Sequence, residues 1–408
     1  MKRFRWVFPA VAGVLLAASG AAADGVMIPV RVGEATNMAA SGRQEAVLAT
    51  DGRTVQVILR TYFRPGPTEL AWIVPVPAKV ASVDKADEAV FEHLNRIAAP
   101  RFYVASGKGG KGFGCGCGGV GDKATDAQGS VVVEASGTAG IFKYVALGAT
   151  DAADLAKWLN DHKYFVPPSA DRLFKRYVDA GWHWLAMRIR PDAADKPALA
   201  PHPIRYTYSD SRLVYPLAIS QLSADLENEI LLYVVAPSRY ACANWANATI
   251  ERRDLRVVRG TPSGTNYEDL FRRACAASAG HAFVTEWSSK QSLFGYADGR
   301  SGEINDVLDR GLIDALGSRQ TVTRLRALMT PAAMDRDVTL LPTTWAAVDN
   351  RFHLSAAASP GGVLAAWAAI IAAGGLLCAG LRLIGAPGWR RAGGVVCIAA
   401  ACTALAMI

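Results

Sequence analysis

The sequence lacks the short patterns that mark several common enzyme classes. None of its six histidines is followed four residues later by a second one with a glutamate between them, so the helical zinc-hydrolase motif is absent. No Gly-x-Ser-x-Gly elbow of a serine hydrolase occurs. The glycine-rich stretch 107–119 does not end in Gly-Lys-Ser/Thr, so it is not a phosphate-binding loop. We therefore predict no catalytic residue and no cofactor, and the pattern favours a protein that is not an enzyme.

Acidic residues are missing from the first 23 positions, which have the three-part layout of a secretory signal. Lys2, Arg3 and Arg5 precede an apolar stretch, and small residues end the segment at Ala21 and Ala23. This layout predicts a signal peptide over 1–23 that is cleaved before Asp24. No cysteine follows the apolar stretch, so a lipid anchor of the lipoprotein type is not expected.

Charge is also missing near the other end, over the 21 residues of 361–381. At about 1.5 Å per residue this length crosses a bilayer core of about 30 Å, and we expect a transmembrane helix over 361–384. A second uncharged stretch, 392–408, is short for a span, which leaves a single helix and a helical hairpin as alternatives. Arg382, Arg390 and Arg391 lie between the two stretches and should stay in the cytoplasm. The domain 24–345 and a linker, 346–360, are then extracytoplasmic, on the periplasmic side of a bacterial cytoplasmic membrane.

The positive charge of the whole chain is concentrated in these two ends. The formal net charge is +8, with three positive charges in the signal and three in the membrane loop, which leaves only +2 for the domain between them. This balance does not call for a polyanionic partner. We predict no nucleic-acid binding.

Strand and helix patterns alternate irregularly through the domain. A meander of about three antiparallel strands is predicted over 45–76, and further strands over 131–135, 141–147, 182–190, 204–208, 213–219, 230–236 and 281–287. Helices are predicted over 86–98, 151–162, 169–180, 303–316 and 321–329, and one that starts from a capping box at 265–268. Without strict strand–helix–strand alternation, the class is α+β, with mixed, largely antiparallel sheets and packed helices.

Several segments, in order along the chain, resemble the bacterial domain of unknown function 2330. They are QEAVLATDG at 44–52, ELAWIVPVP at 69–77, APRFY at 99–103, TDAADL at 150–155 with Trp158 and Leu159, GW at 181–182, LVYPL at 213–217 and VTRL at 322–325 with Asp337. The resemblance implies an envelope domain that often bears a signal and a membrane anchor. It implies no activity.

The cysteines carry the most distinctive local chemistry. Cys115 and Cys117 lie one residue apart in a flexible glycine-rich loop, 106–130, near Lys108 and Lys111, where thiolates bind soft metals or exchange disulfides. Cys242 and Cys275 bring the domain's total to four, and an even number in an oxidising compartment favours structural disulfides. Sequence leaves three connectivities open, as well as unpaired buried thiols, of which Cys275 on an apolar helix face is an example.

Two other residue types are weighed as site candidates. His183 falls on the apolar face of its strand, where a hydrogen-bonded core histidine is the more common interpretation, although a cleft joining His183 or His202 to an acid would favour a hydrolase. Aromatics on alternating strands are typical of a sheet core, whereas exposure of Trp182 and Trp184 would indicate a binding groove. The other aromatics considered for such a groove are Trp158, Tyr206, Tyr208 and Tyr215.

Three functional hypotheses follow. The first is a non-catalytic envelope module, anchored in the membrane, that binds an envelope protein or a small-molecule ligand. The second is a periplasmic thiol, metal or redox protein acting through Cys115 and Cys117, and the third is a hydrolase with an unrecognised site.

Overall fold

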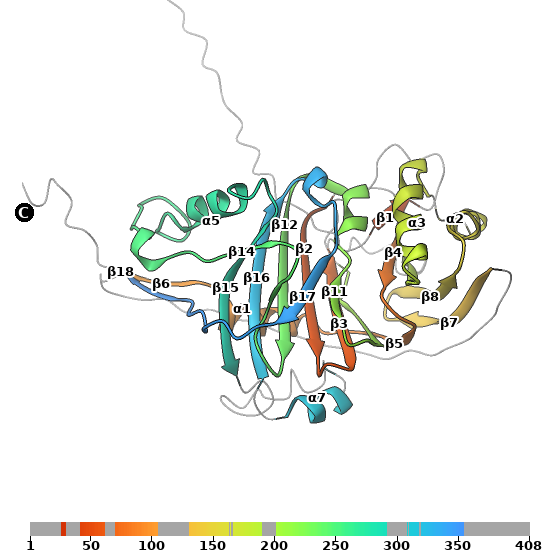
Figure 1. The fold of residues 1–408 in the computed structure, drawn as a ribbon, viewed down its shortest axis with the longest axis horizontal. Coiled ribbons are helices and arrows are strands. Elements are labelled where there is room, and N and C mark those ends of the chain that lie inside the picture. The colour runs from red at the N-terminus through yellow and green to blue at the C-terminus, as the bar shows by residue number, and fades with distance from the viewer. Residues whose placement is uncertain are drawn as a thin grey trace, which may run out of the picture.

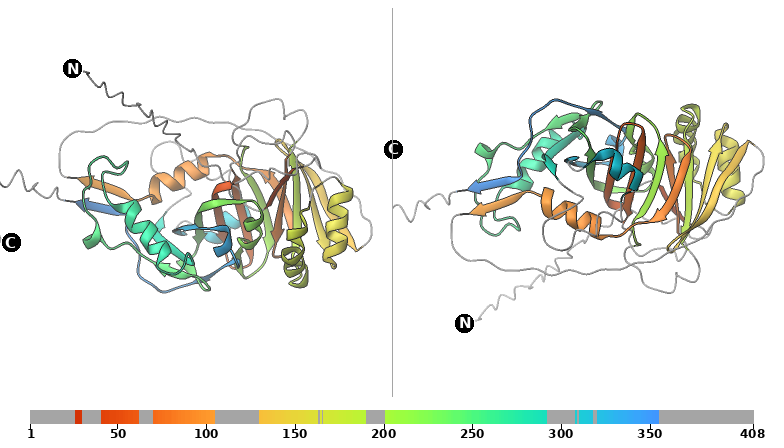
Figure 2. Two further views of the ribbon diagram at one scale, coloured as in Figure 1. Left: turned by 90° about the horizontal axis from the view of Figure 1, so that it is seen from above. Right: turned by 90° about the horizontal axis from the view of Figure 1, so that it is seen from below.

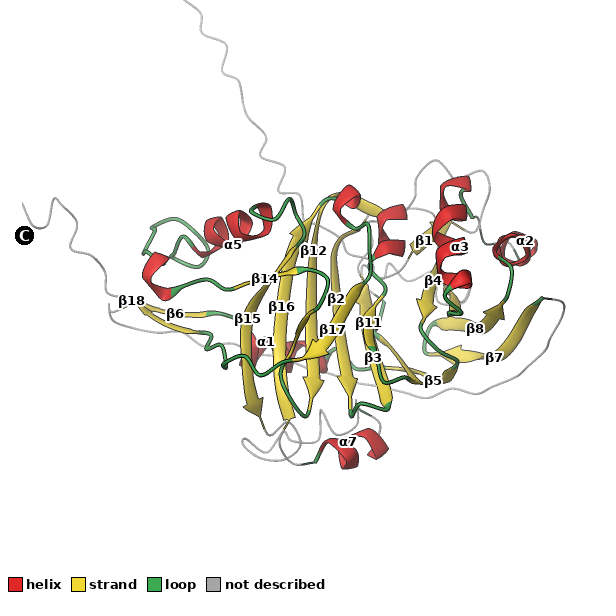
Figure 3. Cartoon of the chain, viewed as in Figure 1, coloured by secondary structure: helices red, strands yellow, loops and turns green. Residues whose placement is uncertain are grey.

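Strands dominate the domain, as the alternating patterns predict. The computed structural model describes residues 26–29, 41–61, 70–104, 130–162, 164, 166–189, 201–291, 308, 310–317 and 320–354. Within these ranges the strands form four sheets, and helices pack against the two larger ones (Figure 1, Figure 3). The predicted α+β class with mixed sheets is confirmed. The predicted signal, nearly all of the glycine-rich loop and both predicted membrane segments lie outside the described residues.

The larger sheet has eight described strands in the order β14-β15-β16-β12-β2-β3-β10-β5. Neighbouring strands are antiparallel except in two pairs, β12 with β2 and β14 with β15. The strands are β2 (Ser41–Thr50), β3 (Thr54–Thr61), β5 (Val80–Lys85), β10 (Ile204–Ser209), β12 (Ala224–Ala236), β14 (Ala246–Ala248), β15 (Ala282–Gln291) and β16 (Gln320–Met329).

The second sheet is antiparallel, in the order β1-β4-β9-β8-β7. Its strands are β1 (Val26–Pro29), β4 (Leu70–Val76), β7 (Val131–Ala139), β8 (Phe142–Ala149) and β9 (His183–Ile189). The predicted three-stranded meander is therefore only partly right, because β2 and β3 form a hairpin while β4 joins this second sheet. Residues 71–74 of β4 are all buried, as expected of an interior strand covered on both faces.

Two small sheets and the helices complete the described domain. One small sheet has the order β11-β17-β13, and the other pairs β18 with β6 in parallel. These strands are β6 (Arg101–Val104), β11 (Leu213–Tyr215), β13 (Tyr240–Cys242), β17 (Val338–Pro342) and β18 (Arg351–Leu354). The helices are α1 (Ala89–Ala98), α2 (Ala152–Asp161), α3 (Asp171–Asp179), α5 (Tyr267–Ala276) and α7 (Arg310–Leu316), with short 3₁₀ helices η2 (Pro168–Ala170), η3 (Ala218–Leu222), η4 (Arg252–Asp254) and η5 (Pro331–Ala333).

The two larger sheets are covered on both faces. Side chains such as Leu48, Trp72, Met187 and Leu232 form a core shared by the two larger sheets and the β11-β17-β13 sheet. The outer face of the five-stranded sheet packs on α2 and α3. The outer face of the eight-stranded sheet packs on α1 and α7 in one region and on α5, β6 and β18 in another.

One predicted helix is wrong: residues 321–329 lie in strand β16. Its apolar residues fit a helical spacing, but Leu325, Ala327 and Met329 also alternate, and these three fill the core between the sheets. The intervening Arg324 and Arg326 point to the other face, where distant acids neutralise them. Residues 320–329 form a strand because they pair with β12 on one side and with β15 on the other.

Two smaller predictions also need correction. At the start of α5 the N-cap is Asn266 without a side-chain cap bond, and Glu268 binds Arg326 instead of closing a capping box. The Thr265 hydroxyl does accept a hydrogen bond from the backbone N–H of Tyr267 at 3.2 Å. The predicted strand 213–219 is the short β11 followed by η3.

Candidate functional site

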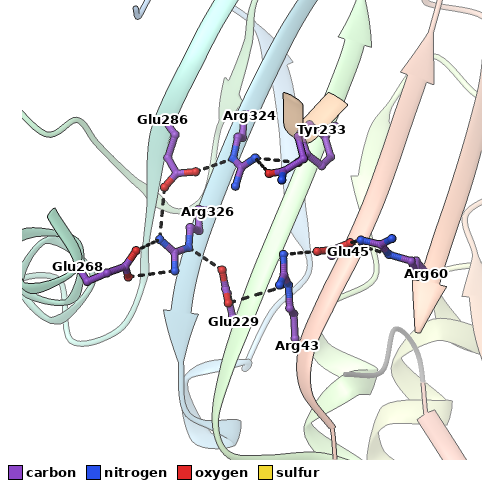
Figure 4. Close-up of polar contacts among 10 residues, drawn as sticks. Arg43, Glu45, Arg60, Glu229, Tyr233, Glu268, Glu286, Arg324 and Arg326 are labelled. Atoms are coloured by element: carbon purple, nitrogen blue, oxygen red, sulfur yellow. Dashed lines mark hydrogen bonds and ion pairs between the residues drawn. The ribbon is translucent and has the colours of Figure 1, made fainter. Parts of the chain in front are cut away.

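A row of arginines and glutamates crosses the outer face of the eight-stranded sheet (Figure 4). Because alternate residues of a strand share a face, each strand contributes residues to this one row. Five strands and α5 supply its charged members, which are Arg43, Glu45, Arg60, Glu229, Glu268, Glu286, Arg324 and Arg326. The row contains four positive and four negative side chains, so it is neutral as a whole.

The inner end of the row is buried and fully paired. Arg324 Nε donates to Glu286 Oε2 at 2.6 Å, and the two side chains are 7% and 0% exposed. Arg324 Nη1 donates to Tyr233 Oη at 2.8 Å and to Asn95 Oδ1 of α1 at 2.6 Å. Burial alone would lower the pKa of Arg324, but Glu286 outweighs it and the pKa is raised. Arg324 is therefore held in its charged form.

Arg326 links the buried end to α5. Its Nε donates to Glu229 Oε1 at 2.6 Å, and its Nη1 and Nη2 donate to the two oxygens of Glu268 at 2.9 and 3.1 Å. The guanidinium also lies 4.0 Å from the centre of the Phe271 ring, within range of a cation–π contact. This arginine therefore fixes α5 on the sheet.

The outer end of the row centres on Glu45 of β2. This carboxylate is 1% exposed and binds both Arg43 and Arg60. Arg60 also packs over the ring of Phe91 in α1, 4.6 Å from its centre. Arg43 is 40% exposed, so the row reaches solvent at this end.

The chemistry available to the row follows from its partners. Arginine stays protonated in proteins and cannot exchange protons at ordinary pH. The buried carboxylates Glu45 and Glu286 are each bound by arginine. The row is thus suited to holding α1, α5 and the sheet in one arrangement, and less suited to acid–base catalysis.

A second polar cluster joins the outer part of the five-stranded sheet to the rest of the domain. Tyr177 of α3 donates to Asp337 Oδ1 at 2.6 Å, and the backbone N–H of Ala218 donates to the same atom at 2.9 Å. The backbone N–H of Ile219 donates to Tyr177 Oη at 3.2 Å. Burial raises the pKa values of both Asp337 and Tyr177. The cluster fixes α3 against η3 and the start of β17.

The structure does pair His183 with an acid. Its Nδ1 lies 3.0 Å from Glu134 Oε2, and both side chains are mostly buried. Glu134 occupies the irregularity in β7 between Val133 and Ala135, so its side chain reaches past β8 to β9. Gly148 provides space for the Glu134 side chain, because a Cβ at position 148 would lie only 3.1 Å from Glu134 Oε1.

His202 has a structural role in a turn. Its Nε2 accepts a hydrogen bond from the backbone N–H of Ile141 at 2.9 Å, and its Nδ1 lies 3.0 Å from the carbonyl oxygen of Pro203. Burial lowers the pKa of His202, which favours the neutral ring. His183 and His202 are thus held by different partners, and only His183 meets a carboxylate.

The groove hypothesis for the aromatics is wrong. Trp182 and Trp184 are buried against Tyr177 of α3, with ring centres 4.9 and 5.7 Å away. The other members are core residues as well: Tyr206, Tyr208 and Tyr215 are buried, and Trp158 packs partly buried against the same core as α3. The alternative interpretation, a sheet core, is confirmed.

Two of the four cysteines of the predicted external domain, Cys242 and Cys275, lie among the described residues. Cys242 and Cys275 are buried free thiols that belong to different core clusters. Burial raises the pKa of both thiols, which disfavours the reactive thiolate. Cys115 and Cys117 lie outside the described residues. In the described ranges no group of three or more His, Cys, Asp or Glu side chains is arranged to hold a metal.

Sequence reasoning missed the arginine–glutamate row. Its only visible signal was charge at alternate positions of strand patterns, as in Arg43 and Glu45 or Arg324 and Arg326. Charges in buried strands need partners. Those partners come from strands far apart in sequence, which no local pattern identifies.

The fold and this row define an α+β domain whose large mixed sheet is cross-linked by a neutral line of ion pairs. The chain belongs to the bacterial family described as "Uncharacterized protein conserved in bacteria (DUF2330)", which matches residues 19–339. The expected family is thereby confirmed. Several row and cluster residues, among them Glu45, Arg324 and Asp337, fall in the segments that carry the resemblance.

Solved structures similar to this chain include baculovirus P35. That structure covers 74% of this chain and 97% of its own, with 8% identity and a TM-score of 0.35. For the structure of the caspase-8/P35 complex, the match covers 74% of this chain and 97% of that chain, with 8% identity and a TM-score of 0.30. Similarity at this level carries no functional conclusion. No curated protein matches the chain in sequence.

Among the described residues, none of the helices has the length and apolar character that a membrane crossing requires.

Proposed function

We propose that this protein is a non-catalytic module of the bacterial envelope, held outside the cytoplasmic membrane by its C-terminal segment, where it binds an envelope protein or a small-molecule ligand. One observation carries the non-catalytic part. The buried carboxylates Glu45, Glu286 and Asp337 are bound by arginines or by a tyrosine and a backbone amide. Groups committed in this way stabilise a scaffold and do not turn over a substrate.

The location rests on the sequence. The signal pattern at 1–23 and the uncharged stretch 361–381 both predict an external domain, and arginines follow the second stretch. A reporter that is active only outside the cytoplasm tests this. Fused after Pro360 it should be active, and fused at Pro387 it should be silent. The reverse pattern would overturn the proposed orientation, and a fusion after Ile408 reports whether 392–408 crosses the membrane.

The His183–Glu134 pair favours a hydrolase as a second candidate function. A histidine oriented by a carboxylate can act as a general base for a nucleophile. Full-length protein can be treated with a fluorophosphonate probe, which labels activated serines. Labelling that is lost in His183→Asn would promote this candidate. We expect no labelling.

The hypothesis of a thiol, metal or redox protein depends on Cys115 and Cys117. Metal analysis of the purified protein and of a double serine variant tests it directly. Stoichiometric zinc or copper that disappears in the double variant, without loss of stability, would favour this function over a binding module.

A further inference from the structure

The described residues end at Leu354, at one end of the domain, and the predicted membrane anchor follows in sequence. β18 and β6 pair in parallel, and both end there, with Leu354 beside Val104 (Figure 1). Figure 2 shows the same end from above and from below, opposite the end that carries β7 and β8. We call this region, formed by β6, residues 349–354 with β18, and residues 251–260, the C-terminal end.

Chain length places the C-terminal end close to the membrane. The uncharged stretch begins at Gly361, seven positions after Leu354. A fully extended chain covers at most about 3.3–3.6 Å per residue, so the end of β18 lies within roughly 25 Å of the bilayer. This geometry holds for any conformation of the connecting residues.

Exposed positive charge gathers at the C-terminal end. Arg252 Nη2 donates to the carbonyl oxygen of His353 at 2.7 Å, which holds η4 against β18. Six arginines here are exposed, against three exposed acids. The arginines are Arg101, Arg252, Arg253, Arg256, Arg259 and Arg351, and the acids are Glu251, Asp254 and Asp349. The excess is larger than the +2 of the whole external domain, so the rest of that domain is slightly negative.

An exposed aromatic pair lies on the same end. Tyr103 stacks on His353 with ring centres 4.8 Å apart, and Tyr103 is 44% exposed. Tyrosine has an apolar ring and a polar tip, which suits the boundary between lipid and water. The helices at the opposite end instead pair exposed lysines with acids one turn away, as in Lys157–Asp161 and Lys175–Asp179.

We propose that the C-terminal end lies on the outer surface of the membrane and binds the headgroups of anionic lipids through its arginines, with Tyr103 at the headgroup level. The proposal rests on the proposed membrane anchorage. It adds a fixed orientation, because a domain bound this way cannot rotate freely on its connecting residues. Each arginine near an anionic surface strengthens binding about fivefold.

The test uses the full-length protein reconstituted into vesicles of zwitterionic lipid, with or without anionic lipid. A photo-crosslinking amino acid replaces Tyr103 in one variant and Val132 in the other. Val132 lies on β7 at the opposite end and is 47% exposed, which closely matches Tyr103. We expect lipid adducts at position 103 in anionic vesicles and none at position 132, as read by mass spectrometry.

Charge reversal then tests the arginines. Arg253→Glu with Arg351→Glu should lower the adduct yield at position 103 about fivefold or more, whereas Lys143→Glu, an exposed residue of β8, should not. Equal adduct yields at 103 and 132, or insensitivity to both anionic lipid and charge reversal, would overturn the proposal. The reporter fusion after Pro360 separates the two levels: an active reporter without adducts rejects only the lipid contact, and a silent reporter rejects the anchorage as well.

Discussion

His202 and Ile141 are joined by a hydrogen bond in which the ring nitrogen Nε2 accepts from the backbone N–H of the turn between β7 and β8 at 2.9 Å. The ring also packs edge-on against Phe142, with centres 5.4 Å apart. Gly140 of the same turn has φ of +58°, and a Cβ there would lie 2.0 Å from His202 Nε2. A residue with a Cβ at position 140 would therefore clash with the His202 ring in its observed position.

Acid should weaken this turn. Nε2 can accept the bond only while it is unprotonated, and burial lowers the pKa of His202 below its ordinary value of 6.5. The unfolded chain then binds the proton more readily, so the free energy of unfolding should fall as the pH drops through 6.5 toward the folded-state pKa. Urea unfolding at several pH values measures this. His202→Gln should lose that part of the pH dependence, and an unchanged profile in the variant would refute the assignment.

Alanine at position 140 should be strongly destabilising. Gly140→Ala adds both a left-handed backbone penalty of about 1–2 kcal/mol and a clash with His202. Gly260→Ala is the control, since Gly260 has φ of +87° and no atom within 4 Å of the added Cβ. Thermal unfolding should show a clearly larger loss for Gly140→Ala. Adding His202→Ala to that variant should recover the part due to the clash.

Removing Arg324 should cost about 3–5 kcal/mol, because the buried Glu286 would lose its closest cationic partner, at 2.6 Å. It would keep only the Tyr267 hydroxyl at 2.8 Å and Arg326 Nη1 at 3.5 Å. The double variant Arg324→Met with Glu286→Leu should lose much less. Lys157→Ala, which breaks an exposed pair on α2, should change little. Chemical denaturation gives the three values. Additive losses in the double variant would show that the two residues do not act as a pair.

The hydroxyl of Tyr177 should matter more than that of Tyr208. Tyr177→Phe removes the donor to Asp337 and should cost about 1–3 kcal/mol. Tyr208 is equally buried, but its hydroxyl has no hydrogen-bond partner among the described residues. Tyr208→Phe should therefore be neutral or stabilising. Equal melting temperatures for the two variants would argue against a structural role for the Tyr177–Asp337 bond.

Cys242 and Cys275 should be unreactive thiols in the folded protein. Both are buried, and burial raises both pKa values. Alkylation before and after denaturation, read by peptide mass spectrometry, should modify them only in the unfolded chain. Recovery of either residue in a disulfide with Cys115 or Cys117 would contradict the free state and restore the predicted crosslink.

Local patterns predicted most elements but not how they assemble. The pattern over 151–162 predicts a helix, which is found as α2, capped by the side chain of Asp151. Gly181, after α3, has a left-handed backbone with φ of +71°. These features depend on neighbours within a few residues. The strand β16 was missed because its two arginines are stabilised by residues 38 and 97 positions away.

The contacts of the candidate site also depend on residues that are distant in sequence, which local patterns do not reveal. Glu134 reaches His183 only because β7 is irregular and Gly148 lies between them, and neither condition has a local signature. Sequence predicts a strand over 182–190; Trp184 lies in β9, and Trp182 directly precedes it. Their burial depends on α3, which packs across them.

The pairing of β18 with β6 has a consequence for how the protein matures. Asn350, directly before β18, donates to the carbonyl oxygen of Ala99 across 251 positions of sequence. Such high contact order makes folding slow, because long loops must close before these contacts form. We propose that the chain is exported starting from its N-terminus. The edge of β6 that pairs with β18 then stays unpaired until nearly the whole domain has crossed the membrane. Final closure then coincides with the arrival of the membrane segment, and the interval before it is when chaperones and proteases would meet the chain.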